Sequence, residues 1–459
     1  FNVIAPFIVI PYIILKCGEE NFGKSAIGLS IAFFIVVFID FGCDILGVKD
    51  ISINRDNVDK RNYIISRVIY IKCFFTILLS IVFLIVINQV GFFYKNKELF
   101  YFSFPVFMAQ IANPLWIFQG LEKFNLFSYF SILSKSIYIL LIFYFLDQKS
   151  DYVYINLAFG LSVFIAGIVF FFVLNKKYEF VLVPIQLSEL YNYMFANKTY
   201  VLSQTFIWMQ LYSPILLINY FGTSIQVGQF RIVDQIISIF KTYILLSFNF
   251  IYPKICFEFD TNAKEAINSW KIFNTINFIF LSSLLIFLFW FSYEIVDFYH
   301  IMNEEYVSSL LQIALIYPIV FFIVYAFKQL LLALHYEKIF SRIIIAMSIL
   351  NLIIISFVYE KYSLFGVFYS IMMNFEYMVK KAENEVCVTV FFDEGLSDTE
   401  IKKLGDTISN RVEVSSVHYT SAEEAWNNFK SEYFAAYPDL AEGFKDNPLI
   451  NSASYEVYL

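Results

Sequence analysis

Long apolar runs, separated by short polar breaks, make up the first 360 residues of the chain. A helix needs about 20 mostly apolar residues to cross a membrane, and only helices and closed barrels satisfy their backbone groups there. The runs therefore predict an α-helical, polytopic membrane protein. A twelfth run, 364–379, is short and contains Asn374 and Glu376. The eleven clearer spans are 3–16, 26–46, 67–93, 99–119, 125–146, 153–175, 199–221, 230–252, 272–293, 308–333 and 338–358.

The lysine and arginine residues between the spans predict their orientation. Cytoplasmic loops are enriched in these residues, and with the N-terminus inside, the inner loops hold about twice as many as the outer loops, Lys72 being counted among the inner bases. The longest inner loop, 176–198, falls midway and favours two lobes of six helices. A faint internal repeat agrees with this, since duplicated halves are common in transporters. The matching positions are Pro11, Gly18 and Gly23 in the first half and Pro214, Gly222 and Gly228 in the second.

The pattern changes after about residue 364. The stretch "VCVTVFF" alternates as a strand does, and "VEVSSVHYT" predicts a second strand. Ser397 with Glu400, and Ser421 with Glu424, have the spacing of helix capping boxes. These signals predict a small α/β domain over 386–459. An aromatic and apolar cluster within it is either ordinary core or a partner-binding surface, and it comprises Phe429, Tyr433, Phe434, Leu440 and Phe444.

The composition agrees with a membrane part and a soluble tail. Of the 459 residues, 59% are hydrophobic and 15% charged, whereas soluble domains average about 25% charged. From Glu376 onward, 16 acidic residues stand against 7 basic ones, so the net charge of -7 arises in the tail. The chain begins at Phe1 within an apolar run, which favours a fragment over a signal peptide.

The sequence offers no signature of a soluble enzyme. The five cysteines lie far apart, with no CxxC pair and no nearby histidine, which argues against a disulfide framework or a zinc site. There is no P-loop, no dinucleotide-binding glycine pattern, no HExxH and no GxSxG. We therefore expect a protein that is not an enzyme and has no cofactor, no bound metal and no nucleic acid partner.

The eighth predicted span carries the most informative polar residues. In "FRIVDQIISIFKTYILLSFN", Arg231, Asp234, Gln235, Ser238, Lys241 and Thr242 recur at three- and four-residue spacing, which places them in one stripe along a helix. Charged side chains in a span cost about 2.5 to 3.5 kcal/mol each at its centre, so such a stripe normally faces a wet cavity or a partner. The alternative is that Arg231 and Asp234 pair locally while Lys241 extends to the membrane interface.

Further charged residues lie in or beside other spans. Lys16, Lys135 and Lys328, together with Arg231 and Lys241, would give a cavity a net positive charge and would bind an anionic substrate, because Lys and Arg replace the hydration that phosphate loses in the membrane. Asp40 and Asp234 are candidates to pair with these bases or to exchange a coupling proton or sodium ion. Kinks are expected at Asn113-Pro114, Ser213-Pro214 and Tyr317-Pro318.

Two stretches of the first half resemble the Wzx-type polysaccharide flippases of the MOP transporter superfamily. The first is "IPYIILKCGEENFGKSAIGLSIAFFIVVFIDFGCDILGVKDIS", whose matching positions are Pro11, Tyr12, Lys16, Gly18, Gly23, Asp40, Phe41, Gly42 and Lys49. The second is "PLWIFQGLEKFNLFS", with Trp116, Gln119, Gly120, Leu121 and Glu122. Lys16 and Lys49 stand where the family's members carry Arg.

The resemblance covers about 360 residues and implies a fold and a function. It implies a MOP or MATE-like bundle in the bacterial cytoplasmic (inner) membrane, surrounded by membrane lipids. It also implies flipping of an undecaprenyl-pyrophosphate-linked oligosaccharide to the outer leaflet by alternating access, as in lipopolysaccharide synthesis. A related fold could instead export another lipid or a drug, although a positive cavity disfavours a cationic drug.

The tail resembles a different family, the cell-division membrane protein FtsX. The stretch "LFGVFYSIMMNFEYMVKKAENEVCVTVFFDEGLSDTEIKKLGDTI" is similar to the end of its first transmembrane helix and the start of its extracellular domain. The resemblance implies three parts: a flippase-like domain at 1–362, a helix and linker at 363–385, and a partial α/β domain at 386–459. By this pattern the chain stops at "SYEVYL", where another strand is expected to pair.

The joining of two families leaves a conflict and a second possible function. Twelve spans from an inside N-terminus would leave the tail in the cytoplasm, whereas FtsX relatives hold it outside. We therefore interpret the chain as a chimera of two unrelated genes joined near residues 359–365. The alternative function is a membrane-anchored division scaffold that binds a peptidoglycan hydrolase through residues 386–459.

Overall fold

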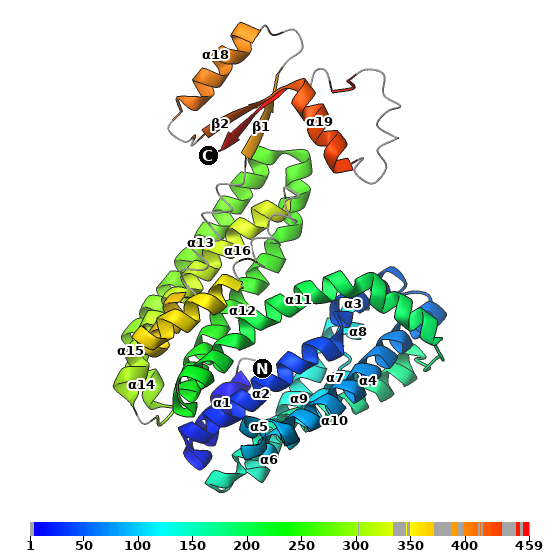
Figure 1. Ribbon diagram of the computed structural model, residues 1–459, viewed down its shortest axis with the longest axis vertical. Helices are drawn as coiled ribbons and strands as arrows, with labels where there is room; N and C mark the ends of the chain where they lie inside the picture. Colours follow the sequence, from blue (N-terminus) through cyan, green and yellow to red (C-terminus); the bar gives the residue numbers. More distant parts are fainter. Residues whose placement is uncertain are drawn as a thin grey trace.

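Helices dominate the part of the chain that the structure describes. This is a computed structural model, and it describes residues 4–301, 303–333, 346, 349–370, 387–392, 396, 398–411, 414, 416–433, 447–449 and 453–458. Within these residues, eight helices are long and apolar enough to cross a membrane, and two shorter apolar helices accompany them. The helices form two lobes, and a small domain with a sheet follows them (Figure 1). The predicted polytopic α-helical fold is confirmed.

The N-terminal lobe runs from α1 to α10. Its helices pack closely at glycines: a Cβ atom added to Gly167 of α10 would lie 2.1 Å from the carbonyl oxygen of Ala112 in α7. The elements are α1 (Ile4–Cys17), α2 (Glu19–Asp40), α3 (Cys43–Ile53), α4 (Val58–Gln89), α5 (Gly91–Lys95), α6 (Lys97–Tyr101), α7 (Phe104–Ala112), α8 (Leu115–Gly120), α9 (Phe124–Phe145), the 3-10 helix η1 (Lys149–Val153) and α10 (Tyr154–Tyr178).

The second lobe, green to yellow in Figure 1, begins with the two longest helices. Its elements are α11 (Leu187–Phe221), α12 (Ser224–Thr261), α13 (Ala263–Trp290), α14 (Ser292–Asp297), α15 (Glu304–Ala314), α16 (Ile316–Ala333) and the helical segment Ile349–Ser370. Each predicted span from the first to the tenth has a helical counterpart. Much of the eleventh, including residues 338–345, lies outside the described part of the chain.

The three predicted kinks have different outcomes. At Asn113-Pro114 the fourth span breaks into α7 and α8, and the side chain of Asn113 accepts a hydrogen bond from the amide of Leu115 at 3.2 Å. The tenth span breaks at Leu315, between α15 and α16, so that Pro318 falls in the first turn of α16, where a missing amide is tolerated. Pro214, in contrast, lies inside an uninterrupted α11.

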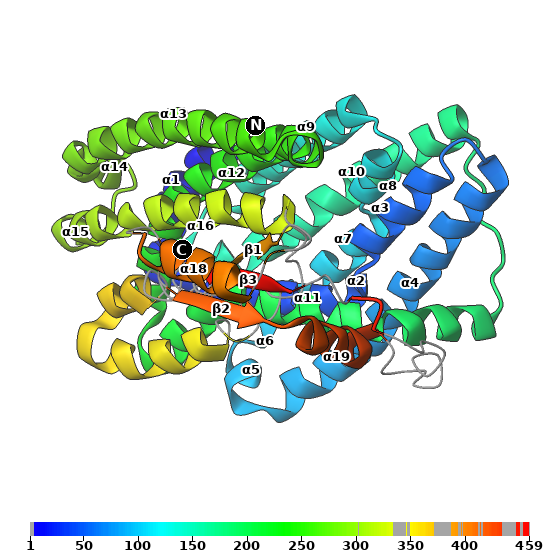
Figure 2. The same cartoon turned by 90° about the horizontal axis from the view of Figure 1, so that it is seen from above.

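The segment Ile349–Ser370 folds back on itself. A straight helix would hold Asn351 and Ser370 about 28 Å apart, yet the hydroxyl of Ser370 donates a hydrogen bond to the Asn351 side chain at 3.2 Å. The reversal coincides with the left-handed backbone of Ser363, whose φ is 51°. Thus the end of the eleventh predicted span and the start of the twelfth are two antiparallel arms, visible in gold in Figure 2.

The second arm of this hairpin packs against α12. Leu364, Val367 and Phe368 are buried, and Phe368 contacts Phe230 of α12 with ring centroids 5.1 Å apart. The turn is fixed by Gln226 of α12, which accepts a hydrogen bond from Tyr359 at 2.9 Å and donates one to Ser363 at 2.8 Å. Residues 363–370, which the FtsX resemblance includes, therefore pack as part of the second lobe.

The two lobes meet at a pair of glycines in α2 and α12. A Cβ atom added to Gly23 would lie 1.7 Å from the carbonyl oxygen of Ser224, and one added to Gly228 would lie 2.7 Å from that of Glu19. These reciprocal contacts join the positions that the internal repeat matched. They are the contacts expected of two halves related by a pseudo-two-fold axis.

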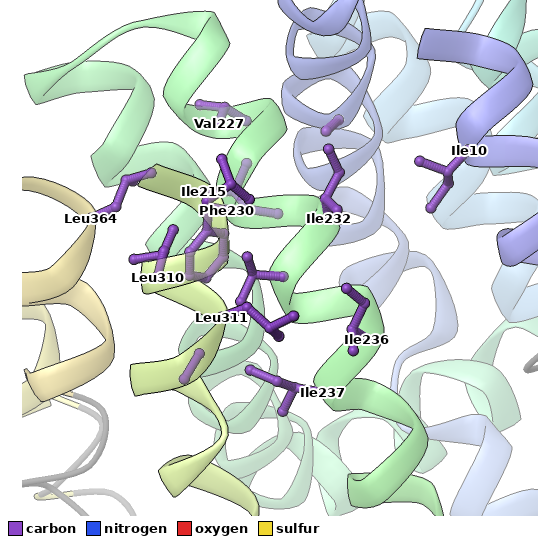
Figure 3. Packing of buried hydrophobic residues seen from close by; sticks show 14 of the residues in the cluster. Ile10, Ile215, Val227, Phe230, Ile232, Ile236, Ile237, Leu310, Leu311 and Leu364 are labelled. Atoms are coloured by element: carbon purple, nitrogen blue, oxygen red, sulfur yellow. The ribbon is translucent and has the colours of Figure 1, made fainter. Parts of the chain in front are cut away.

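Apolar side chains close the lobes together around this point. In Figure 3, α12 presents Ile232 and Ile236 toward Ile10 of α1, and it presents Ile237 toward Leu311 of α15, while Leu310 lies on the side of α15 near Leu364. All of these side chains are buried. The resulting core is continuous from the first lobe to the second.

The segment that links the lobes, 179–186, has no helix or strand and lies along α4. Three hydrogen bonds hold this segment and the last residue of α10 to α4, each joining positions 117 apart in the sequence. Two further contacts hold the first turns of α11 to α4. The bonds join Arg61 to the carbonyl of Tyr178, Asn62 to that of Glu179 at 3.0 Å, and the amide of Val183 to Ser66 at 2.9 Å. The further contacts join Tyr63 to Glu189 at 2.7 Å and the Arg67 guanidinium to the ring of Tyr193 at 3.8 Å.

The described residues of the tail contain a three-stranded sheet and two helices, which agrees with the predicted small α/β domain. Its elements are β1 (Cys387–Phe391), α18 (Asp398–Ser409), β2 (Ser416–Thr420), α19 (Ala422–Tyr433) and β3 (Ser454–Tyr458). The strand β3, from "SYEVYL", lies in the centre and pairs antiparallel with both neighbours, so that Tyr455 faces Val390 of β1 and Tyr419 of β2. The Ser421 hydroxyl caps α19 by accepting from the amide of Glu424 at 3.2 Å, whereas Ser397 lies outside the described residues.

The predicted partner-binding cluster of the tail is only partly described. Phe429 is exposed on α19 and stacks on Trp426, with ring centroids 5.8 Å apart. Tyr433 is the last residue of α19. Phe434, Leu440 and Phe444 lie outside the described part of the chain, so the cluster stays a prediction.

Candidate functional site

The polar stripe of α12 forms a compact set of ion pairs. A carboxylate oxygen of Asp234 lies 3.0 Å from the guanidinium of Arg231, and the other lies 2.8 Å from the ammonium of Lys241. The spacing of three and seven residues brings the three side chains to one face of the helix. All three are partly buried. Two cations therefore share one carboxylate, and the pairing leaves a net positive charge.

The structure bears on the local-pairing interpretation of this stripe, while a wet cavity beside it stays a prediction. Arg231 and Asp234 pair locally, as the alternative interpretation predicts. Lys241 does not extend away from them, because its ammonium turns back to Asp234 and lies 5.5 Å from the ring centre of Tyr317 in α16. The charges therefore stay inside the bundle.

Lys135 adds a third cation from the other lobe. It lies midway along α9 and interacts electrostatically with Arg231. Its ammonium lies 5.2 Å from the ring centre of Phe159. Among the described residues, no carboxylate is within ion-pair distance of it. We name Lys135, Arg231, Asp234 and Lys241 the charged cluster; three cations and one carboxylate give it two net positive charges.

Lys16 lies apart from the charged cluster. Its ammonium pairs with Asp147 at 3.0 Å, where α1 and α9 end, and the side chains of Lys16 and Asp147 are 32% and 85% exposed. Asp151 fixes this loop by accepting hydrogen bonds from the amides of Gln148 at 2.7 Å and Asp147 at 3.0 Å. The bond from Gln148, before the others, holds the pKa of the Asp151 carboxyl below its ordinary value. Lys16 thus has the environment of an anchor at the membrane edge.

Lys328 is also separate from the charged cluster. It lies 4.9 Å from the ring centre of Tyr325 and 5.3 Å from that of Phe248 in α12. Phe248 is seven residues beyond Lys241, which is about 10 Å along a helix. The structure therefore brings together Lys135, Arg231 and Lys241 of the five predicted substrate-binding cations.

Asp40 forms a buried ion pair inside the N-terminal lobe. One of its carboxylate oxygens accepts from Lys72 of α4 at 2.8 Å and from Gln110 of α7 at 3.1 Å. The side chain of Lys72 is 1% exposed and that of Asp40 is 15% exposed. Lys72 was predicted to be a base in an inner loop, so its pairing with Asp40 was not predicted. The signal was available, because Lys72 lies within the apolar run 67–93.

A sequence model described as "Polysaccharide biosynthesis protein" matches residues 1–256, more than half of the chain. The chain belongs to this family. This polysaccharide biosynthesis protein is 24% identical over 360 residues to a protein of Escherichia coli (strain K12) named as an O-antigen transporter, covering 77% of this chain and 86% of that one. A second sequence model, the FtsX extracellular domain, matches residues 385–459. Both resemblances noted in the sequence are confirmed.

Solved structures show the fold. The chain is similar to a multidrug resistance MATE family transporter of the MOP superfamily in an inward-facing conformation, with a TM-score of 0.67 and 12% identity over 82% of this chain and 92% of that one. It is also similar to the lipid II flippase MurJ, with a TM-score of 0.59 and 13% identity over 83% and 85% of the two chains. The polysaccharide biosynthesis protein is thus a multi-pass protein of the bacterial inner membrane with a MOP-type fold.

Proposed function

We propose that this protein flips a lipid-linked oligosaccharide with a diphosphate headgroup from the cytoplasmic to the outer leaflet. The observation that carries the proposal is the charged cluster, whose two net positive charges lie between the lobes of a membrane bundle. A charge at the centre of a span costs about 2.5 to 3.5 kcal/mol unless a wet path or a partner compensates it. A diphosphate supplies the missing negative charge.

The residue types of the cluster suit a phosphate ligand. Arg231 offers a planar fork that can bind two phosphate oxygens at once, while Lys135 and Lys241 act as point charges. The polyprenyl tail can stay in the bilayer while only the headgroup and sugars cross between the lobes. No covalent bond changes, so the protein acts as a transporter and not as an enzyme. The names of the O-antigen transporter and of the lipid II flippase support this class of substrate.

Alternating access follows from the way the lobes meet. The apolar core around Ile10, Ile232 and Ile236 and the contact of Gly23 with Gly228 seal one end of the interface. The positive-inside prediction places this seal at the outer surface. The similarity is higher to the inward-facing MATE transporter, with a TM-score of 0.67, than to the outward-facing one, with 0.55. We therefore assign the described state as open to the cytoplasm, ready to receive substrate.

The charged cluster also suggests how an ion is coupled to transport. A bound diphosphate competes with Asp234 for Arg231 and Lys241, so that Asp234 is released to take up a proton or sodium ion. Asp40 is less suited to this exchange, because its carboxylate faces Lys72 within one lobe. We assign the coupling role to Asp234.

Surface polysaccharide in a strain that depends on this protein tests the proposal. A charge-assisted hydrogen bond contributes about 1.5 to 3 kcal/mol, which corresponds to roughly 10- to 100-fold in binding. We expect Arg231→Ala with Lys241→Ala to reduce surface polysaccharide at least tenfold. Lys16→Ala is the matched control, since its cation lies at the membrane edge, and it should retain most of the activity. Normal polysaccharide in the double variant, at normal protein levels, would refute the assignment.

The match to the FtsX extracellular domain favours a second role, in which the tail binds a peptidoglycan hydrolase. The direction of the chain argues against it. The turn at Ser363 is fixed to Gln226, beside the seal at Gly228, and the following arm leads away from that end. We propose that the tail faces the cytoplasm, where no peptidoglycan is present, and that transport is the function of this chain.

A further inference from the structure

Five aromatic side chains form a continuous row of ring contacts across both lobes. They come from α2, α9, α10 and α11, so no single stretch of sequence contains them. We name them the aromatic ladder. In order, the ring centroids are 5.9 Å apart from Tyr138 to Phe159, 5.5 Å from Phe159 to Phe33, 5.3 Å from Phe33 to Tyr212 and 5.7 Å from Tyr212 to Trp208.

The ladder shares its space with the charged cluster. The ammonium of Lys135 lies 5.2 Å from the ring centre of Phe159. Lys135 belongs to the charged cluster together with Arg231 and Lys241. A ligand whose phosphates contact these cations would therefore bring its adjoining groups against the rings.

The exposure of the ladder differs from that of the aromatic residues of the lobe cores. Phe107, Phe118 and Phe130 in the N-terminal lobe are fully buried, whereas each ring of the ladder keeps some exposed surface. Trp208 is the most open, at 38%. It lies one turn before Tyr212 on the same face of α11, and its ring is nearly parallel to that of Tyr212, at 2°.

The ring of Trp208 lies on the side of α11 that faces α2, because it stacks on Tyr212, which stacks on Phe33 of α2. Phe33 in turn contacts Phe159 of α10, whose ring centre lies 5.2 Å from the ammonium of Lys135 in the charged cluster. Residues four apart on a helix lie on one side of it, so Trp208 lies on the same side of α11 as Tyr212. Because α11 runs toward the outer seal, Trp208 lies on the cytoplasmic side of Tyr212, where a substrate would enter.

We propose that the aromatic ladder binds the sugar rings of the substrate, with Trp208 as the first stacking surface. Aromatic rings present large, flat and rigid apolar faces, and pyranose rings have an apolar C–H face of matching size. The hydroxyls of Tyr138 and Tyr212 can hydrogen-bond to sugar hydroxyls. This inference rests on the proposed function and divides recognition in two: the cations hold the diphosphate, and the rings hold the glycan.

Binding to the purified full-length chain in lipid nanodiscs tests this division. The probes are a prenyl diphosphate that carries a disaccharide and the same prenyl diphosphate without sugar. We expect Trp208→Leu to weaken binding of the sugar-bearing probe by roughly tenfold and to leave the bare probe unchanged. Trp208→Phe keeps a ring and should retain most of the affinity. Trp290→Leu is the matched control, because Trp290 is 77% exposed at the end of α13, and it should alter neither probe.

The outcomes separate this inference from the proposed function. The role of the ladder is overturned if Trp208→Leu weakens the binding of both probes equally or of neither probe. The role of the ladder is also overturned if Trp208→Phe binds the sugar-bearing probe as weakly as Trp208→Leu does. Lys135→Ala with Arg231→Ala should weaken both probes. If that variant binds the bare probe normally, the proposed function fails whatever Trp208 does.

Discussion

The buried pair of Asp40 and Lys72 predicts a large loss of stability on a small chemical change. Asp40→Asn removes one charge and keeps nearly the same side-chain shape. It leaves the Lys72 ammonium, 1% exposed, beside a neutral amide in place of a carboxylate at 2.8 Å. Lys16 and Asp147 form a chemically equal pair at 3.0 Å, but their side chains are 32% and 85% exposed. Asp147→Asn is therefore a control that differs mainly in burial.

The two changes should differ several-fold in their effect. Removing one partner of a buried ion pair costs about 3–5 kcal/mol, because the other charge stays buried and unpaired. An exposed pair contributes about 0–1 kcal/mol. For a unit the size of the N-terminal lobe, 1 kcal/mol shifts the unfolding midpoint by about 2–4 °C. We expect Asp40→Asn to lower that midpoint by about 6–20 °C, and Asp147→Asn by about 4 °C at most.

Thermal unfolding of the detergent-purified chain, followed by loss of its monodisperse peak in size-exclusion chromatography, measures this difference. A third variant, Asp40→Asn with Lys72→Met, removes both buried charges and should recover most of the lost stability. Equal small shifts for Asp40→Asn and Asp147→Asn would refute the view that burial sets the strength of the pair. A double variant as unstable as Asp40→Asn would show that packing, not charge, causes the loss.

Three further predictions follow from the fold. If the tail faces the cytoplasm as proposed, a fluorescent protein fused to the C-terminus should fluoresce and alkaline phosphatase fused there should be inactive; the opposite pattern would contradict that topology. Gly228→Leu should abolish transport while Gly91→Leu does not, because a Cβ atom at Gly228 would lie 2.7 Å from the Glu19 carbonyl oxygen and one at Gly91 would have no atom within 4 Å. Equal transport activity in the two variants would disprove the proposed closure of the lobes at Gly228. Asp151→Asn should lower the free energy of unfolding near pH 7, and the difference from wild type should vanish as the pH falls below about 4, because a carboxyl group with a lowered pKa stabilises the fold only while it is ionised. A difference from wild type that does not change with pH would exclude this cause.

Local patterns predicted the helices and the stripe of α12 correctly. Apolar run length is a property of consecutive residues, and the spacing of Arg231, Asp234 and Lys241 already places them on one face. The break at Pro114 also follows from a local rule, since proline lacks an amide donor. Pro214 has the same chemistry, yet α11 continues through it, so the local rule gives a tendency that neighbouring helices can override.

Pairings between distant residues were not predictable in this way. Lys16 meets Asp147 across 131 positions, and Asp40 meets Lys72 because α2 and α4 are neighbours in the lobe. Counting bases in loops assigned Lys72 to the wrong environment, since a count carries no information about partners. The residues of the aromatic ladder come from four helices, so the sequence of no single helix indicates the ladder. All four members of the charged cluster were predicted from the sequence, but Lys16 and Lys328 were predicted with them because they share residue type but not location.

The bonds between α4 and the 179–186 segment determine where the lobes can move relative to each other. A free loop would absorb a change of angle within its own length. Here the segment is fastened to the first lobe from Tyr178 to Val183, and the first turns of α11 are fastened to it as well. Any swing of one half of the molecule must therefore bend or rotate α11 itself beyond Tyr193. Stiffening that stretch of helix would trap the transporter in a single state even with its entire charged cluster intact.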